Sequence, residues 1–309
     1  MNAARRAGIP HDNRDILARY AYRDNVPADG LKIDGRPALT QVDPTRVGRY
    51  VLLLVRDPLC AYDDDPAAQF AARLDDVDLV GRSGMFTTYS GTYDGAPISI
   101  LSGGSGGPEA ELALMELFEH TNADTFVRVG GSGGMHPSVR PGDLVVTTGV
   151  VRDEGMTTAY VPSSYPAASA PEVVLALAQA ASDLTIRHHI GLTRSTDSDY
   201  VGGGRPGARG FLPASQLDVV DSWSRAGVLN GDRESAAIVT LAALYGLRGG
   251  SVCSVADNIT TGERFAAGAG HTAAMDVALA GMARLYRMDA ERDTAGGTMW
   301  LPSHRGGHV

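Results

Sequence analysis

The sequence has little of several things that whole classes of protein require. Only two of its 309 residues are cysteine, too few for a disulfide framework or a thiolate metal cluster. No stretch approaches the roughly 20 apolar residues of a membrane span, and no apolar run follows the basic residues near the N-terminus, as a secretory signal requires. Basic residues number 27 against 36 acidic ones, a formal net charge of -9, which disfavours a general binder of nucleic acid or membrane surfaces. We therefore expect a cytoplasmic protein with a small-molecule partner, in which Cys60 and Cys253 are buried thiols.

What the sequence does have is a regular alternation of two patterns. Short apolar runs of strand length alternate with segments whose apolar residues recur at helical spacing, which is typical of a parallel sheet between helices. We predict an α/β fold with one domain: a mixed, mostly parallel twisted sheet covered by helices on both faces. Residues 1–45 are predicted to be a polar N-terminal extension or arm, 46–290 the folded domain and 291–309 a C-terminal tail. Strands are expected over 50–55, 97–102, 125–130, 143–151, 188–193 and 250–256, and helices over 108–120, 171–183, 214–225, 233–246 and 271–288.

Two glycine-rich segments follow predicted strands. The first is GGSGGP at 103–108, and the second is GGSGG at 130–134, just after Arg128. Glycines let backbone N–H groups approach an oxyanion and an arginine adds a planar fork of donors, so the second segment indicates an anion site. A tight turn without a ligand explains the same glycines. A Rossmann dinucleotide site is a weaker alternative, because GGSGGP lacks the spacing of that fingerprint.

Three separated segments carry a resemblance to a known family. They read ILSGGSGGPEAELALMEL, VRVGGSGGMHPSVRPGDLVVTTGVV and LNGDRESAAIVTLAALYGLRGGSV. In order and spacing, from about residue 35 to 288, they resemble the nucleoside phosphorylases, most closely the uridine phosphorylase branch. The resemblance implies an α/β domain that cleaves the N-glycosidic bond of a nucleoside or nucleotide. It implies inorganic phosphate as co-substrate, no metal or other cofactor, and assembly as a homodimer or as a hexamer built from dimers.

The resemblance also assigns roles to individual residues. Glu234 matches the glutamate that binds the ribose hydroxyls, and Arg128 matches a phosphate-binding arginine, with Gly131 and Ser132 in the neighbouring turn. The resemblance also covers Asp257. Uridine phosphorylases carry an asparagine at the matching position, whereas purine-type relatives carry an aspartate that is thought to protonate the leaving base. Each has a purely structural alternative: a carboxylate at a helix N-terminus for Glu234, an exposed or paired strand arginine for Arg128, and a turn cap for Asp257.

The predicted phosphate site departs from the family pattern. Cys60 stands where the resemblance expects a phosphate-binding arginine, and a second such arginine falls on Gly84. Losing two charge-assisted hydrogen-bond donors without replacement would weaken phosphate binding by roughly 10²–10⁴-fold. Arg56, in place of a family glycine, and Arg82, close to Gly84, are the candidates that could restore the lost charge.

The predicted base and sugar sites depart as well. The family's glutamine and arginine that read uracil fall on Gly203 and Arg205, and an expected aromatic residue falls on Asp199, so uridine is not the default substrate. The family's 5′-hydroxyl histidine falls on Arg36 and its ribose-side methionine on Arg233. These two arginines suggest an anionic 5′ group on the substrate, with pairing to nearby acids such as Asp34 or Asp232 as the alternative.

The leading interpretation is an enzyme that cleaves or forms a ribosyl–base bond with phosphate as the acceptor. Asp257 and Glu234 are the catalytic candidates, and Arg233 and Arg36 join Glu234 at the ribose. One alternative is a phosphate-independent nucleosidase, for which Asp57 is the candidate to activate water. Another is a catalytically silent member that binds a nucleoside. The sequence leaves the base, the 5′ group, the acceptor and the number of subunits open.

Overall fold

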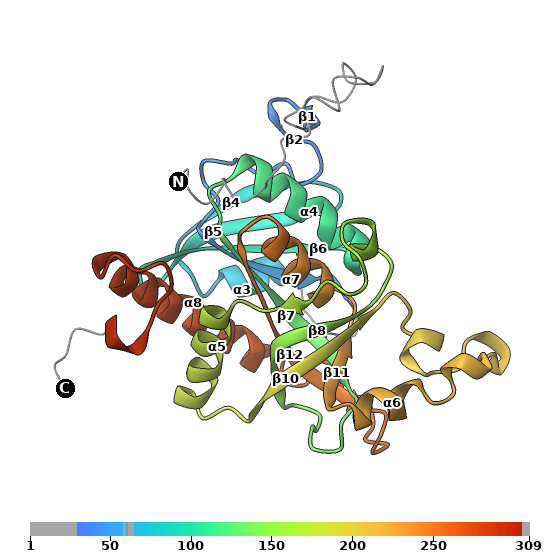
Figure 1. Ribbon diagram of the computed structural model, residues 1–309. Coiled ribbons are helices and arrows are strands. Elements are labelled where there is room, and N and C mark those ends of the chain that lie inside the picture. Colours follow the sequence, from blue (N-terminus) through green and yellow to red (C-terminus); the bar gives the residue numbers. More distant parts are fainter. Residues whose placement is uncertain (1–29, 58–59, 61–64, 305–309) are drawn as a thin grey trace.

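The structure is a computed structural model that describes residues 30–57, 60 and 65–304. Residues 1–29 of the predicted N-terminal extension and 305–309 of the predicted tail lie outside the described residues. The described part of the extension contains a two-stranded hairpin, β1 (Lys32–Ile33) and β2 (Arg36–Pro37), which stands apart from the main sheet (Figure 1).

A ten-stranded mixed sheet forms the middle of the molecule, which confirms the predicted fold class. Its strand order is β11-β10-β8-β12-β7-β3-β6-β5-β4, with β9 on β8. Parallel pairings join β7 to β3 and β12, β3 to β6, and β10 to β8 and β11, while β4, β5 and β6 form antiparallel hairpins at one edge. The strands are β3 (Tyr50–Val55), β4 (Asp75–Arg82), β5 (Thr87–Tyr93), β6 (Ala96–Gly103), β7 (Thr125–Gly134), β8 (Leu144–Asp153), β9 (Ala167–Ala168), β10 (His188–Thr196), β11 (Val228–Asp232) and β12 (Arg248–Asn258).

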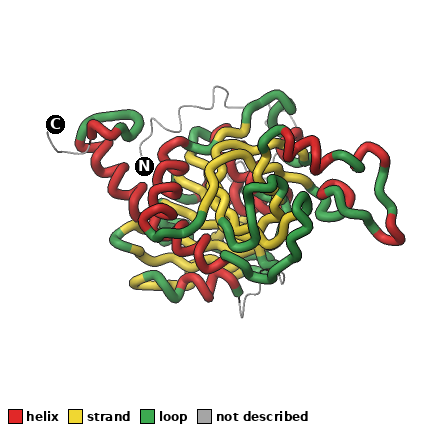
Figure 2. Tube along the Cα trace, turned by 90° about the horizontal axis from the view of Figure 1, so that it is seen from below, coloured by secondary structure: helices red, strands yellow, loops and turns green. Residues whose placement is uncertain are grey.

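Helices cover both faces of this sheet, as expected from the alternating pattern. Within β3, Leu52 and Leu54 face the apolar cluster beneath α3, α5 and α8, whereas Val51 and Leu53 face the cluster beneath α4 and α7. Figure 2 shows the strands enclosed by helices. Because successive strand residues point to opposite faces, a fully apolar run such as YVLLLV supplies both clusters. The helices are α3 (Pro66–Ala71), α4 (Gly107–His120), α5 (Pro171–Asp183), α6 (Val219–Arg225), α7 (Ser235–Leu244) and α8 (His271–Thr294).

The structure corrects two local predictions. The segment GGSGG at 130–134, predicted to be a turn, continues β7, because β12 pairs with it along its length and β11 pairs with Gly133 and Gly134 on the other side. We call residues 130–134 the glycine segment. The predicted helix over 214–225 is divided into a 3-10 turn (Ala214–Gln216) and α6.

The segment between β10 and α6, residues 197–218, projects from the body of the molecule (Figures 1 and 2). It contains short 3-10 turns at Val201–Gly203, Ala208–Gly210 and Ala214–Gln216. It also contains several residues that the sequence assigns to base recognition. Among residues 30–57, 60 and 65–304, no helix is both long and apolar enough to cross a membrane.

A charged cluster ties the start of β12 to α8. The Arg248 guanidinium donates to both carboxylate oxygens of Asp289, at 2.7 and 2.8 Å, and to Asp124 at 2.9 Å. Tyr50 also donates to Asp289 at 2.8 Å, and Arg49 to Asp124 at 2.8 Å. Burial opposes ionisation of both aspartates, but the two arginines outweigh it and hold the pKa of Asp124 and of Asp289 below the usual value. The cluster is therefore a charged anchor, to which Arg292 adds a further hydrogen bond to Asp289 at 2.7 Å.

Candidate active site

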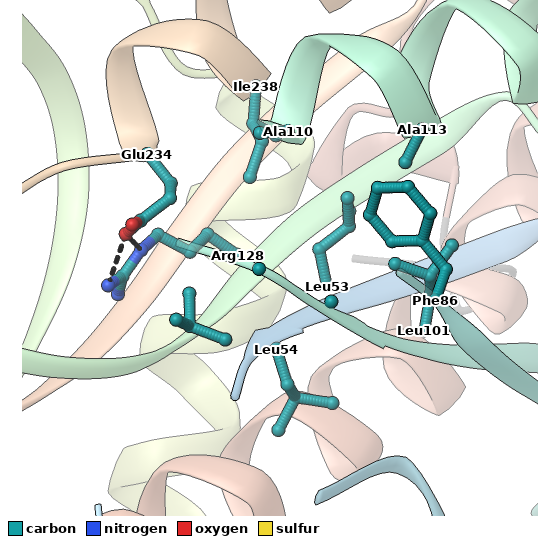
Figure 3. Close-up of a pocket in the computed structure, with 12 residues that line it drawn as sticks. Leu53, Leu54, Phe86, Leu101, Ala110, Ala113, Arg128, Glu234 and Ile238 are labelled. Carbon is teal, nitrogen blue, oxygen red and sulfur yellow. Dashed lines mark hydrogen bonds and ion pairs between the residues drawn. The ribbon is translucent and has the colours of Figure 1, made fainter. Parts of the chain in front are cut away.

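Arg128, in the middle of β7, is the centre of a buried polar cluster. Its Nε donates to Glu234 Oε2 at 2.8 Å and its Nη2 lies 2.7 Å from the same carboxylate (Figure 3). Its Nη1 donates to Cys253 Sγ at 2.8 Å, and its Nη2 to the Gly131 carbonyl at 3.0 Å. Asp232 Oδ2 lies 3.1 Å from Nε. Because a guanidinium carries five N–H donors, most of the hydrogen-bonding capacity of Arg128 goes to protein groups.

Burial raises the pKa of two members of this cluster, Asp232 and Cys253. Burial is the largest influence on Asp232 and raises its pKa, Glu234 raises it further, and Arg128 acts in the opposite direction. Burial raises the pKa of the Cys253 thiol to about 11, so this thiol is neutral at physiological pH. Both cysteines are buried, as the sequence predicted. The carboxyl groups of Asp232 and Glu234 thus offset the positive charge of Arg128. A bound anion therefore needs attractive groups besides Arg128.

Glu234 connects the cluster to the first glycine-rich segment. Its Oε1 accepts a hydrogen bond from the Gly106 backbone N–H at 2.6 Å, immediately before α4. Glu234 stands at the N-cap of α7, but its side chain makes no capping hydrogen bond there, which weighs against a purely structural capping role. A carboxylate offers about four acceptor positions, so the contacts from Gly106 and Arg128 leave room for a hydroxyl donor.

Arg233 and Asp199 lie together beside that segment. Arg233 Nη1 is 3.2 Å from Asp199 Oδ2 and 3.2 Å from Ser105 Oγ. A Cβ at Gly106, where φ is +101°, would be 3.3 Å from Arg233 Nη2. The glycine therefore allows both an unusual backbone conformation and the approach of the guanidinium. The structure shows the alternative considered for Arg233, pairing with an acid, although the acid is Asp199 rather than Asp232.

Arg205 and Asp257 form a second pair at the far end of the glycine segment. The Arg205 guanidinium donates to the Asp257 carboxylate at 2.5 Å, and a Cβ at Gly133 would lie 3.0 Å from Asp257 Oδ1. The turn after β12 is capped by the neighbouring residue: Asn258 Oδ1 accepts from the backbone N–H groups of Thr260 and Thr261 at 2.9 and 3.2 Å. Arg205 and Asp257 therefore stand side by side as a donor and an acceptor.

The remaining side of the glycine segment faces Cys60 and His271. A Cβ at Gly131 would lie 2.9 Å from His271 Nε2 and 3.5 Å from Cys60 Sγ. The Ser132 hydroxyl is committed elsewhere, donating to the Ser254 carbonyl at 2.8 Å and accepting from Asn230 at 2.9 Å. We interpret Ser132 as a residue that positions the strand.

The other predicted residues make their side-chain contacts outside the Arg128 cluster. Arg56 forms an ion pair with Asp65 at 2.6 Å near the end of β3, and Arg82 lies exposed on the edge strand, 3.4 Å from the Tyr89 hydroxyl. Arg36 lies on the hairpin and donates to the Gln41 carbonyl at 3.3 Å. Gly203 lies in the projecting segment. Across the described part of the chain, no group of three or more His, Cys, Asp or Glu side chains is placed to hold a metal ion.

Sequence reasoning missed three members of the site. Cys253 was interpreted only as a buried thiol, yet it accepts a hydrogen bond from Arg128. His271 was not singled out, because nothing in the sequence around it indicates that the start of α8 lies against the glycine segment. Asp232 was considered only as a partner for other arginines, although its place in the motif GDRES was a usable signal.

A small pocket lies beside the Arg128–Glu234 pair (Figure 3). Apart from that pair its walls are apolar or glycine, which keeps water from screening the two charges. The lining residues are Leu53, Leu54, Val55, Phe86, Leu101, Gly103, Gly104, Ala110, Ala113, Arg128, Glu234 and Ile238.

The sequence is similar to a known family of proteins and to several of its members. Residues 59–287 match the phosphorylase superfamily. The chain is 40% identical over 263 residues to a uridine phosphorylase of Thermococcus kodakarensis, which covers 85% of this chain and 91% of that protein. It is 34% identical over 202 residues to a uridine phosphorylase of Escherichia coli, covering 65% and 79%. A guanosine phosphorylase of Halorubrum lacusprofundi is 31% identical over 190 residues, covering 62% and 73%.

Proposed function

The chain belongs to the phosphorylase superfamily, with uridine phosphorylase-like relatives, and from that membership we propose that it is a nucleoside phosphorylase. The reaction is a pentosyl transfer: the C1′–N bond to the base breaks, a C1′–O bond to phosphate forms, and the proton of hydrogen phosphate ends on the base. Inorganic phosphate is the co-substrate, and we expect no further cofactor. The observation that carries the proposal is the buried Arg128–Glu234 pair, 2.7 Å apart beside the glycine segment.

The roles follow from charge and position. Glu234 accepts hydrogen bonds from the ribose hydroxyls, and its negative charge stabilises the positive charge that builds on the sugar as the base departs. Arg128 holds Glu234 in place and adds positive charge on the phosphate side. Arg205 donates to the base as negative charge develops on it, and Asp257 orients Arg205. This division gives Asp257 a positioning role in addition to the general-acid role expected from the resemblance.

The comparisons do not favour the two alternatives from the sequence, a phosphate-independent nucleosidase and a catalytically silent nucleoside binder. The relatives named above are phosphorylases, which argues for phosphate rather than water as the acceptor. A silent nucleoside binder has less use for a cluster that joins a sugar carboxylate to a phosphate-side cation.

The substrate itself stays a prediction. Arg205 and Asp257 offer one donor group and one acceptor group to the base, while Gly203 offers no side chain in place of the expected amide. An anionic 5′ group gains support only from Arg233, which lies close to Gly106 but is paired with Asp199. Arg36 could take part only from a second copy, in keeping with the homodimer or hexamer that we propose.

The test is a panel of purine and pyrimidine nucleosides and their 5′-phosphates, each incubated with and without inorganic phosphate, with products identified by mass. We expect release of free base together with a sugar 1-phosphate, only when phosphate is present. Release of base and free ribose without phosphate would show a nucleosidase instead. Nucleoside binding measured by calorimetry, with no product in any arm, would show a silent binder.

A further inference from the structure

The ion pair of Arg205 and Asp257 lies against the far end of the glycine segment. A Cβ at Gly133 would lie 3.0 Å from Asp257 Oδ1 and 3.7 Å from Arg205 Nη2, so a side chain there would crowd the carboxylate. Gly133 is two residues beyond Gly131, whose carbonyl oxygen accepts from Arg128, and two residues of strand span about 7 Å. The proposed sugar side and base side of the site are therefore successive positions along one strand.

The backbone around Arg205 forms a closed turn. The Arg205 N–H donates to the Tyr200 carbonyl oxygen at 2.9 Å, and the Gly204 N–H donates to the Val201 carbonyl oxygen at 3.1 Å. Gly204 has a φ of +74°, which a glycine adopts without strain. The Arg205 side chain is 48% exposed and that of Asp257 is 14% exposed. The pair is thus positioned by the backbone and still accessible to a ligand.

The pair has hydrogen-bonding capacity beyond its internal contact. A guanidinium carries five N–H donors, and the bond from Arg205 to Asp257 Oδ2 uses one of them. A carboxylate offers about four acceptor positions, and the same bond takes one of those. The second oxygen, Oδ1, faces Gly133. The pair therefore presents N–H donors and, directly beside them, carboxylate oxygens.

We infer that the Arg205–Asp257 pair makes this enzyme select guanine nucleosides over those of uracil and adenine. The inference rests on the proposed function. Along one edge, guanine presents N7 and O6 as acceptors, followed by N1–H and N2–H as donors. The guanidinium can donate to both acceptors, as arginine does when it reads guanine in DNA, while the carboxylate accepts from both donors. All four groups of that edge then have partners.

Uracil and adenine do not match the pair in this way. The uracil edge presents O4, N3–H and O2, and the adenine edge presents N7, N6–H and N1, so each runs acceptor, donor, acceptor. Either base can accept from Arg205 and donate to one oxygen of Asp257. Its last acceptor then faces the second carboxylate oxygen with no hydrogen between them. Unsatisfied acceptors of this kind are costly, and sites built for one set of hydrogen bonds reject close analogues for this reason.

Gly203 leaves room for a base larger than uracil. It stands where the family resemblance expects the glutamine that reads uracil, two residues before Arg205. Among the described residues, a Cβ at Gly203 would approach only the Ser198 carbonyl oxygen, at 3.7 Å. The position is therefore open, and no amide there completes a uracil pattern. Asp257 acts here as an acceptor, and the proton of the base comes from hydrogen phosphate, as in the proposed reaction.

Binding of nucleosides to the full-length protein without phosphate tests the inference apart from turnover. Calorimetry with wild-type protein should show guanosine binding roughly 10-fold or more tighter than uridine and adenosine. Inosine, which lacks the N2 amino group, should bind about 3–10-fold more weakly than guanosine. In Asp257→Asn the amide replaces one acceptor with a donor, so the guanosine-to-uridine ratio should fall to about 3 or less.

The matched control is Asp221→Asn. Asp221 also pairs with an arginine, Arg225 at 2.6 Å, but on the exposed helix α6. This variant should keep the wild-type ratio. In kinetics at saturating phosphate, the ratio of kcat/KM for guanosine and uridine should follow the binding ratio in each variant.

The outcomes separate this inference from the proposed function. Equal binding and equal kcat/KM of guanosine, uridine and adenosine in wild-type protein would overturn guanine selection even if phosphorolysis occurs. An unchanged ratio in an Asp257→Asn variant that circular dichroism shows to be folded would overturn it as well. If the variant does not fold, the comparison of guanosine with inosine and adenosine in wild-type protein still decides. Absence of phosphate-dependent cleavage of every nucleoside would refute the proposed function, whatever the binding ratios.

Discussion

Arg128 and Glu234 are separated by more than a hundred residues of sequence, yet their side chains lie 2.7 Å apart and are almost fully buried. The pair joins the centre of the sheet to the start of α7, and through Glu234 Oε1 it also holds the backbone before α4. Three elements therefore meet at one carboxylate. In the proposed reaction, the same carboxylate holds the ribose.

Replacing Glu234 with glutamine should reduce kcat/KM for the nucleoside by about 100-fold or more. The change removes the negative charge that stabilises the developing charge on the ribose, and it weakens charge-assisted hydrogen bonds to the hydroxyls. Steady-state kinetics at saturating phosphate is the measurement. Glu119→Gln, on the exposed face of α4, is the control and should leave kcat/KM unchanged. A folded Glu234→Gln enzyme with wild-type kinetics would remove Glu234 from the mechanism.

Replacing Arg128 with methionine should destabilise the protein by about 3–5 kcal/mol, since it leaves Glu234 and Asp232 buried without their cation. The free energy of unfolding in urea is the measurement. Arg225→Met is the control, because Arg225 pairs with Asp221 on an exposed helix face and such pairs contribute less than about 1 kcal/mol. Equal losses in the two variants would show that the buried pair is not an important stabilising contact.

Acid should destabilise the protein through Asp124 and Asp289. Their pKa values are lowered on folding, so the unfolded chain binds more protons than the folded protein as pH falls. The stability that they contribute is present above their unfolded pKa of 3.8 and is lost as pH falls through the lower folded pKa. Measured from about pH 5 to about pH 2, the unfolding free energy of Asp289→Asn should fall less steeply than that of the wild-type protein.

The control for this pH series is Asp94→Asn, in the exposed turn between β5 and β6. In Asp94→Asn the unfolding free energy should fall with pH as steeply as in the wild-type protein. If the unfolding free energies of Asp289→Asn and wild-type protein fall equally steeply with pH, the assigned role of the Arg248 cluster is contradicted.

Replacing Arg205 with glutamine should raise KM for the nucleoside by roughly 10–100-fold and leave KM for phosphate unchanged, because only the base-side donor is lost. The size of the effect should depend on the base in the panel. Arg209→Gln, exposed in the same projecting segment, is the control. Equal increases in KM for the nucleoside and for phosphate would indicate that Arg205 maintains the structure of the site rather than binding the base.

The central strands and helices could be predicted because the residues that define them are close together in the sequence. The run YVLLLV has the length and composition of a buried strand, and Pro108 with Glu109 marks the start of α4. The glycine segment was predicted wrongly as a turn, because glycine favours turns unless neighbouring strands pair with it on both sides. β12 and β11 provide that pairing here, and both lie far away in the sequence.

By itself, the sequence determined the fold class, the family resemblance and the residue types at the candidate site. These depend on periodicity and on motifs that are contiguous in the chain. Only the tertiary structure decided which charges meet: Arg233 with Asp199, Arg205 with Asp257, and Arg128 with Glu234, Asp232 and Cys253. It also placed His271 against Gly131 and showed which ring nitrogen faces it. Hydrogen bonds and ion pairs act over a few ångströms, and folding alone brings such distant residues within that range.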